Sequence, residues 1–170
     1  MSCSQTLAGI ARDCAAVIGG IKRVLLANKA DVTTVTVTSD KVTAITMAAS
    51  AKFKEYAFRR NTGSLTSEYQ VSEDNDSKFV QTDLVMVFSK METVKRIEVV
   101  ALAQADLVAI VEDANGKYWF LGFDEPVYLV TGNQLTGTAR ADLNGYNVTL
   151  RDISKELPYE VDDSIISGLL

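Results

Sequence analysis

The chain has 170 residues, of which 47% are apolar and 23% are charged, a composition typical of one soluble globular domain with a sizeable core. Its net charge of −5 disfavours tight nucleic-acid binding, because phosphate contacts need Lys and Arg. The absence of His excludes Ser-His-Asp and Cys-His catalysis, and two cysteines (Cys3 and Cys14) are too few for a four-thiolate zinc site.

The first fifty residues predict an arm followed by strands. Residues 1–18 are expected to form an N-terminal arm, and we do not interpret them as a signal peptide, because they lack a basic start and Arg12-Asp13 interrupts the apolar run. Residues 19–32 predict a strand. The alternating Val and Thr residues of 32–49 predict a hairpin that turns near Ser39-Asp40.

Residues 50–90 are expected to form one extended β-excursion, longer than the usual strand of about five or six residues. Its middle, 73–77, is a polar loop. The stretch "DNDSKF" at 74–79 has the oxygen-rich start of a calcium loop, but it lacks the central Gly and carries Val85 at the twelfth position. We therefore interpret it as a solvated hairpin tip.

Residues 90–104 predict the helix of the chain. Met91, Val94, Ile97, Ala101 and Leu102 fall within an arc of about 140° at helical spacing, although Glu98 lies inside the same arc. This arc is expected to be the face that packs on the core.

The remaining sequence predicts closely spaced strands at 106–113, 117–123, 126–132, 134–143 and 146–154. Asn115-Gly116 and Asn144-Gly145 are the dipeptides typical of two-residue hairpin turns. Pro158 then introduces a C-terminal arm, 158–170. The expected fold is mainly β: an antiparallel sandwich or barrel of about eight strands with one flanking α-helix, in a single domain covering 1–170.

The carboxylates around the 115–116 turn could in principle form a pair for acid–base catalysis. They stand at predicted strand ends, where Asp and Glu are common, and no nucleophile, phosphate-binding loop or metal ligand set accompanies them. We therefore expect a structural hairpin, with no catalytic residue, cofactor or metal. Trp119, inside the apolar run from Tyr118 to Phe123, is expected to be buried in the core. The four carboxylates considered above for acid–base catalysis are those of Glu112, Asp113, Asp124 and Glu125.

The order of elements resembles the bacteriophage tail-tube family, across about 60% of the chain. The resemblance rests on a β-excursion, one helix, and then two segments. In the family the first has the form D-x-N-G-x-Y/W…L-G and the second T-G-x-A-x-x-D-x-N-G-Y-x-x-T-L. Here they comprise Asp113, Asn115, Gly116, Tyr118, Trp119, Leu121 and Gly122, then Thr136, Gly137, Ala139, Asp142, Asn144, Gly145, Tyr146, Thr149 and Leu150. The "GGIKRVLLAN" opening is similar to virion proteins of phages of Bacteroidetes-type hosts. The G-x-x-x-G run usual after the aromatic hairpin is replaced by "GFDEPVYL".

This resemblance implies a virion structural protein, made in the host bacterial cytoplasm and located in the phage tail. Its copies would form stacked rings, usually hexameric, with other tail or connector proteins as partners and no membrane. DNA would pass through the lumen without being bound, which agrees with the net charge of −5. The long strands suggest Glu55 and Asp83 as lumen residues. Subunit contacts are expected from aromatic and apolar side chains of the excursion and the C-terminal arm: Phe53, Tyr56, Phe58, Phe79, Ile165, Ile166, Leu169 and Leu170.

Three other functions stay open at this point. A head–tail connector or tail-terminator ring would share the architecture of a tail tube. A β-rich hydrolase or glycan-active enzyme would use the Asp and Glu residues. A carbohydrate- or protein-binding module would display Tyr118 and Trp119.

Overall fold

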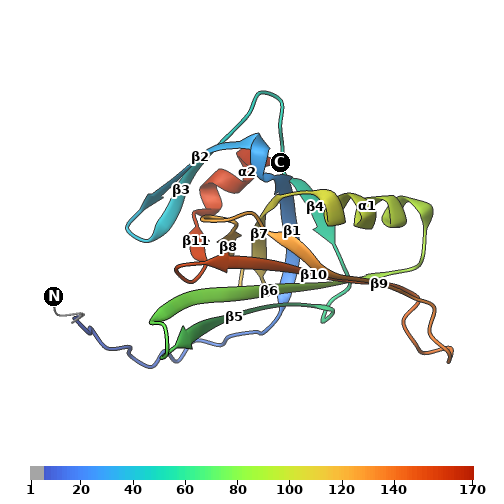
Figure 1. Ribbon diagram of the computed structural model, residues 1–170, viewed down its shortest axis with the longest axis horizontal. Helices are drawn as coiled ribbons and strands as arrows, with labels where there is room; N and C mark the ends of the chain where they lie inside the picture. Colours follow the sequence, from blue (N-terminus) through green and yellow to red (C-terminus); the bar gives the residue numbers. More distant parts are fainter. Residues whose placement is uncertain (1–5) are drawn as a thin grey trace.

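The computed structural model describes residues 6–170 and shows a mainly β protein with two sheets and two short helices (Figure 1). Residues 6–20 form an exposed arm without regular structure, as expected for this part of the chain. The elements that follow are β1 (Ile21–Asn28), η1 (Lys29–Asp31), β2 (Val32–Thr38), β3 (Lys41–Met47), β4 (Lys54–Ala57), β5 (Gly63–Ser72), β6 (Ser77–Ser89), α1 (Thr93–Gln104), β7 (Leu107–Asp113), β8 (Tyr118–Leu121), β9 (Tyr128–Leu135), β10 (Gly145–Ser154), β11 (Tyr159–Val161), η2 (Asp163–Ile165) and α2 (Ile166–Leu169).

The larger sheet has seven strands in the order β2-β3-β11-β8-β7-β1-β4. Its central strands β1 and β7 contain the continuous apolar runs 24–27 and 107–111, which are buried on both faces of the sheet. All its pairings are antiparallel except that of β11 with β3, which is parallel. The expectation of a purely antiparallel architecture is therefore wrong at this position: the last strand of the chain inserts between β3 and β8.

The smaller sheet has four antiparallel strands in the order β5-β6-β10-β9. In Figure 1 its strands run across those of the larger sheet, so the two sheets pack face to face with crossed strands. The first core lies between them. Leu84, Met86, Val148 and Leu150 supply one wall and alternating side chains of β1 and β7 supply the other.

A second core lies on the opposite face of the seven-stranded sheet. Leu25, Ile110 and Phe120 point into it, and the C-terminal residues Ile166 and Leu169 cover it. The backbone N–H of Phe53 donates to the Leu169 carbonyl at 2.9 Å, and the N–H of Asp162 donates to that of Val42 at 2.9 Å. These hydrogen bonds hold the C-terminal segment on its own chain.

The fold corrects the expected closed barrel and the strand count. Neither sheet closes on itself, and the described chain has eleven strands instead of about eight. Residues 50–90 do not form a single excursion, because β4 joins the seven-stranded sheet while β5 and β6 join the other. β6 contributes Val80, Leu84 and Met86 to the buried interior, so this region belongs to the body of the molecule.

The hairpin turns show where local sequence decides structure. The turn at Ser39-Asp40 is confirmed, with φ of 52° and 59°, the left-handed values that a two-residue hairpin needs. The hairpin at Asn115-Gly116 also forms, but its loop spans residues 114–117 and of these only Gly116 has a positive φ. Instead of a tight turn, Asn144-Gly145 ends a loop of residues 136–144. The predicted strand at 134–143 is therefore wrong beyond Leu135.

The predicted helix is confirmed within a few residues, and the face expected to be buried is confirmed only for Met91 and Leu102. Leu102, Val99 and Ala105 point toward the first core, and Met91 packs there from just before the helix. Val94 and Ile97, expected inside, are 77% and 56% exposed. Neither helix among residues 6–170 is long and apolar enough to cross a membrane.

Candidate assembly surfaces

The outward face of the four-stranded sheet belongs to neither core and is mainly polar, although it also carries Phe79, Val85, Val87 and Ile153. Along β6, Gln81, Asp83 and Val85 alternate with the buried Thr82 and Leu84, and the register places the outward residues of the other strands beside them. Most are uncharged: Ser64, Thr66, Thr131, Asn133, Asn147 and Thr149.

One ion pair dominates the electrostatics of this face. The Arg151 guanidinium donates from Nε to Asp83 Oδ1 at 2.7 Å and from a terminal nitrogen to Asp83 Oδ2 at 2.9 Å, across the pairing of β10 with β6. These hydrogen bonds hold the pKa of Asp83 below its usual range. The two charges cancel, so the face presents a nearly neutral polar surface.

Both edges of the four-stranded sheet are open. Within residues 6–170, no strand pairs with the outer edge of β5 or of β9. Unblocked edges present unpaired N–H and C=O groups and pair readily with other chains. Each edge strand also exposes large apolar side chains: Tyr69 and Val71 on β5, and Tyr128, Val130 and Leu135 on β9.

The four strands are staggered along the sheet. Through β10, Leu135 and Tyr128 of β9 lie level with Ser89 and Asp83 of β6. β5 instead lies level with the part of β6 from Met86 to Ser77. Such a progressive offset from strand to strand is what closing a sheet into a barrel requires.

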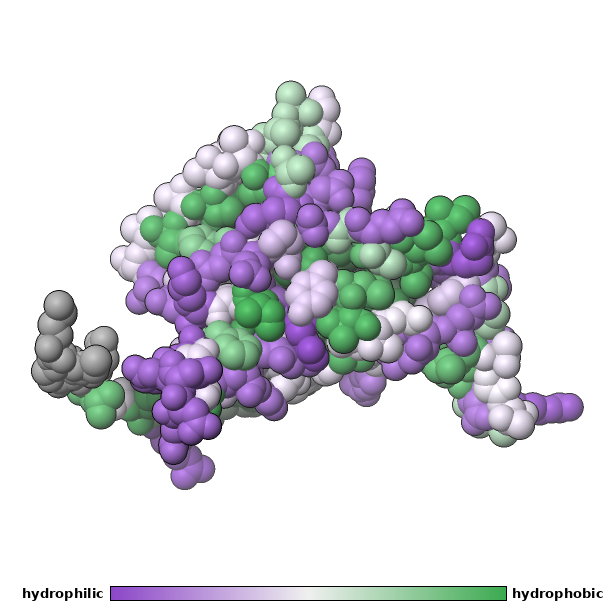
Figure 2. All heavy atoms as spheres, in the orientation of Figure 1, coloured by the Kyte–Doolittle hydropathy of each residue, from purple (hydrophilic) through white to green (hydrophobic). Residues whose placement is uncertain are grey.

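Helix α1 carries an uncovered apolar strip beside the β9 edge. Val94, Ile97 and Val100 follow one another at intervals of three residues, so they lie along one side of the helix, and all three are exposed. The other side of α1 packs on β9: a Cβ at Gly132 would lie 3.5 Å from Val99 Cγ1. In Figure 2, green apolar atoms reach the surface near the right-hand end of the molecule, where Figure 1 places α1 and β9.

The expected contact residues divide into separate groups. Phe53, Ile166 and Leu169 are buried in the second core, with Ile165 packed against it, so the expectation that they meet a neighbouring subunit is corrected. The C-terminal segment packs on its own chain because it caps the far face of the larger sheet. Leu170 remains partly exposed.

The aromatic residues of 50–90 are also not brought together. Tyr56 and Phe58 pack around Phe88, with ring centroids 6.3 and 6.4 Å from it, at the border of the first core. Phe79 lies on the outward face of β6, at the far end of the strand from Phe88.

The two expected lumen residues lie on different sheets. Asp83 is on the outward face of the four-stranded sheet, whereas Glu55 on β4 belongs to the seven-stranded sheet and accepts a hydrogen bond from Arg23 at 2.8 Å. They do not line one wall. Sequence reasoning missed Glu68, which lies beside Gln81 on the same face as Asp83, because the pairing of β5 with β6 defines that face.

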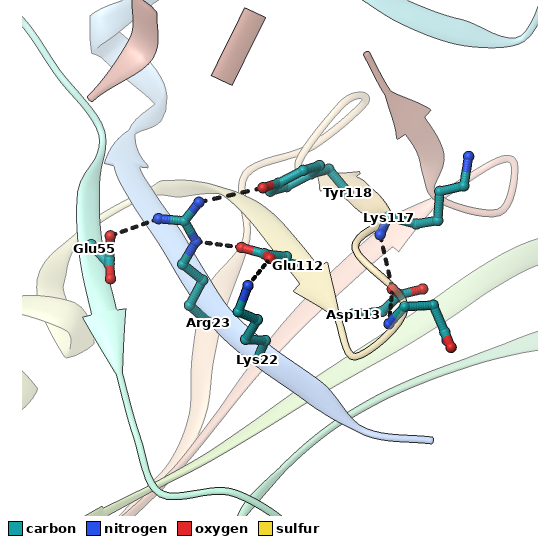
Figure 3. A network of polar contacts seen from close by, with 8 residues as sticks. Lys22, Arg23, Glu55, Glu112, Asp113, Lys117 and Tyr118 are labelled. Atoms are coloured by element: carbon teal, nitrogen blue, oxygen red, sulfur yellow. Dashed lines mark hydrogen bonds and ion pairs between the residues drawn. The ribbon is translucent and has the colours of Figure 1, made fainter. Parts of the chain in front are cut away.

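A polar network on β1 and its neighbours explains Glu112 (Figure 3). Lys22 Nζ donates to Glu112 Oε1 at 2.8 Å, and Arg23 Nε donates to Oε2 of the same carboxylate. Burial alone would raise the pKa of Glu112, but hydrogen bonds and charges from these two cations outweigh it and hold the pKa low. An ionised carboxylate with both oxygens engaged is poorly suited to donate a proton.

Two of the other carboxylates of 112–125, those of Asp113 and Asp124, also have structural partners, whereas Glu125 is exposed. Asp113 accepts from the backbone N–H groups of Asn115 and Lys117 at 2.8 and 2.9 Å, which closes the hairpin loop. Asp124 accepts from the N–H of Lys155 at 2.9 Å. Among residues 6–170, no group of three or more acidic or cysteine side chains is placed to hold a metal ion.

Trp119 is half-buried and lies outside both cores, which corrects its expected burial. Its indole Nε1 donates to Asp113 Oδ2 at 3.3 Å. The next residue, Phe120, is the core aromatic, with 1% of its surface exposed. Side chains alternate along β8, so Trp119 and Phe120 face opposite sides of the seven-stranded sheet, and only Phe120 reaches a core.

The fold and surfaces define a class: a two-sheet β protein with an uncovered polar sheet face and open, apolar-lined sheet edges. Comparison with protein-family models, with curated proteins and with solved structures finds no match to this chain.

Proposed function

We propose that this chain is a self-assembling virion structural protein, a tail-tube or tube-like subunit whose copies form stacked rings around a lumen that conducts DNA. The observation that carries the proposal is the four-stranded sheet, which combines a polar outward face with two open, staggered edges. The resemblance of its turn and strand motifs to tail-tube proteins points to the same function.

Rotational symmetry fixes how the sheet would continue from copy to copy. Every pairing within it is antiparallel, so β5 and β9, the first and fourth of four strands, run in opposite directions. Rotation about the ring axis gives each copy the same strand directions. The β9 edge of one copy therefore meets the β5 edge of the next in antiparallel orientation, and the ring closes as an uninterrupted antiparallel barrel.

The polar face would line the lumen. Its uncharged side chains and the compensated Asp83–Arg151 pair offer few sites that could hold phosphate, so DNA would slide without being gripped. Glu68 adds a repelling charge on the same face. Glu55, on the other sheet, has no part in this wall.

A connector or tail-terminator ring would use the same edges and is the nearest alternative. Display of Tyr118 and Trp119 to a ligand has less support, because Arg23 donates to the Tyr118 hydroxyl at 3.3 Å and Asp113 accepts from the indole. Those contacts tie both rings to their own sheet.

The test is the assembly state of the purified protein, by negative-stain microscopy and native mass spectrometry at high concentration. Rings or tubes are expected from the natural sequence, and Val130→Lys should reduce them to monomers, since a charge on an exposed edge strand opposes pairing. Thr36→Lys is the matched control on the exposed edge strand of the other sheet. A monomeric natural protein, or equal loss of assembly in both variants, contradicts the proposal.

A further inference from the structure

The apolar strip of α1 is exposed to solvent and takes no part in packing the helix on its own chain. Val94 and Ile97 have 77% and 56% of their surface in solvent, although the other side of the same helix packs through Leu102 and Val99. Exposed apolar surface gathered on one element commonly marks a contact site. A second exposed apolar pair, Tyr69 and Val71, lies at the end of β5, 57% and 60% exposed.

The apolar strip of α1 and the exposed pair Tyr69 and Val71 lie on the same side of the four-stranded sheet. Tyr69 pairs with the buried Val80, and Leu65, four residues earlier on β5, pairs with Leu84 of the first core. Tyr69 and Val71 therefore point to the inner side of the sheet, beyond the part that the larger sheet covers. Helix α1 packs on that same side at the opposite edge, where Gly132 pairs with the buried Val148.

The offset between neighbouring strands determines where along β9 a second copy's Tyr69 and Val71 would meet the strip on α1. From β5 to β9 the midpoints of the strands shift steadily toward the Ser89 end of β6, although β6, β10 and β9 all end level with Ser89. The same offset carried one strand further brings the second half of a neighbouring β5, with Tyr69 and Val71, level with the part of β9 that contains Gly132. Val99 of α1 lies against that residue.

We propose that the strip formed by Val94, Ile97 and Val100 is the docking site for Tyr69 and Val71 of a second copy of this chain. The inference rests on the ring proposed above and adds a side-chain contact on its outer side, next to the main-chain pairing of β9 with β5. Neither feature meets the other within one chain, because they lie at opposite edges of the sheet.

Disulfide trapping tests the contact in the full chain with Cys3→Ser and Cys14→Ser. Ile97→Cys combined with Tyr69→Cys should give intermolecular disulfides under mild oxidation, seen as a ladder of covalent oligomers. Ala103→Cys with Tyr69→Cys is the matched control, because Ala103 is exposed on another side of the same helix, and it should yield at least tenfold less product. Equal yields from both pairs overturn the proposal.

A second pair of cysteine substitutions distinguishes failure of the ring from failure of this helix contact. Thr131→Cys with Gln70→Cys, which the same offset places opposite each other on the outward face, reports on the pairing of β9 with β5 alone. If that pair cross-links and Ile97→Cys with Tyr69→Cys does not, the ring stands and the helix contact is wrong. If neither cross-links and the protein is monomeric, both proposals fail.

The N-terminal arm is the competing occupant of the strip, since it exposes Leu7 and Ile10. Ile97→Cys in a chain that keeps the native Cys14 and carries Cys3→Ser distinguishes it. A disulfide between residue 97 and Cys14, within or between chains, would show that the arm covers the strip and would overturn the proposal. Its absence, together with the Ile97–Tyr69 product, supports the second copy's β5.

Single substitutions give an independent readout by sedimentation. Ile97→Lys and Tyr69→Lys should each weaken ring association at least tenfold, and the double variant should be scarcely weaker than either alone, because both remove the same contact. Both side chains are exposed in the single chain, so the unfolding transition should not move. Additive losses would contradict direct contact between them.

Discussion

Asp152 is a carboxylate with only 2% of its surface exposed, at the end of a small pocket that Phe120 and Asp124 also line. It accepts from the backbone N–H of Gly122 at 3.1 Å. Burial raises its pKa to about 6, and the charge of Asp124 adds to the effect while that of Lys29 opposes it. The folded protein thus keeps this proton at pH values where the unfolded chain has already released it.

The pH dependence of stability follows from that shift. Because the folded state binds the proton more tightly, the contribution of Asp152 to stability falls as pH rises from about 4 to 6 and stays low above. Asp152→Asn keeps an acceptor for Gly122 and removes the buried charge. It should raise the free energy of unfolding by about 2 kcal/mol at pH 8 and leave it little changed near pH 4.

Denaturant titrations at both pH values would measure this, with Asp83→Asn as the comparison. The pKa of Asp83 is lowered by Arg151, so its contribution to stability is present at neutral pH and is lost as pH falls through the lowered pKa. Asp83→Asn should therefore lower stability at pH 8. The expected effects at pH 8 have opposite signs, so a loss of stability from Asp152→Asn at pH 8 would refute the assignment.

The adjacent aromatics Trp119 and Phe120 should differ sharply. Phe120→Ala removes a fully buried ring from the second core and should cost about 3–5 kcal/mol of unfolding free energy. Trp119→Ala should cost about 1–2 kcal/mol, because this side chain is half-exposed and loses one hydrogen bond to Asp113. Thermal and denaturant unfolding would rank the two variants, and a reversed ranking would show that Trp119 is the buried ring.

At the scale of elements, Gly145 fixes the approach of β10 to β6. A Cβ at this position would lie 2.0 Å from the Phe88 carbonyl oxygen, which belongs to the partner strand's backbone and cannot move aside cheaply. Gly145→Ala should cost about 3 kcal/mol or more, as the strands must separate locally.

Gly168→Ala is the control for this prediction. Nothing lies within 4 Å of a Cβ at Gly168, which is inside α2, so this substitution should be neutral or slightly stabilising. Denaturation midpoints of the two variants would test the contrast. Similar midpoints would mean that β6 and β10 can accommodate a side chain at their junction.

Local signals predicted some elements and failed for others on identifiable grounds. The strand at β1, the Ser39-Asp40 turn and the helix at 93–104 follow from patterns within a few residues. Asn144-Gly145 has the same letters as a hairpin turn, yet the glycine is needed for close approach to Phe88. No local pattern distinguishes these two uses of a glycine.

Local sequence patterns also predicted only part of the candidate surfaces. Asp83 was predicted as an exposed wall residue and lies on the outward face, where alternation along β6 places it. The inner face of α1 was predicted only in part, because the helix has apolar residues on two sides and only the fold decides that Leu102 and Met91 pack while Val94 and Ile97 do not. The edges of β5 and β9 depend on strand order, which non-local pairing sets.

At the scale of the whole molecule, the C-terminal segment completes the structure. β11 lies between β3 and β8, and Ile166 and Leu169 close the second core. Deleting residues 160–170 should therefore unfold the protein, because it divides the larger sheet and exposes Phe53. Two buried aliphatic side chains alone account for roughly 3–6 kcal/mol.

Circular dichroism and proteolysis of the truncated chain would test this, with removal of Leu170 alone as the control, since that residue is partly exposed. The control should fold as the full chain does. A cooperative unfolding transition in the longer truncation, with a near-normal midpoint, would show that the larger sheet survives without β11 and α2.

The parallel pairing of β11 with β3 also bears on how the protein forms during synthesis. The β2–β3 hairpin leaves the ribosome more than a hundred residues before β11, and only β11 joins it to β8. Until then its inner edge has no partner, although β1, β4, β7 and β8 can already associate. Folding of the larger sheet should therefore include a late step, after β11 has been synthesised, that a chaperone could protect and that a translational pause between β8 and β11 would delay.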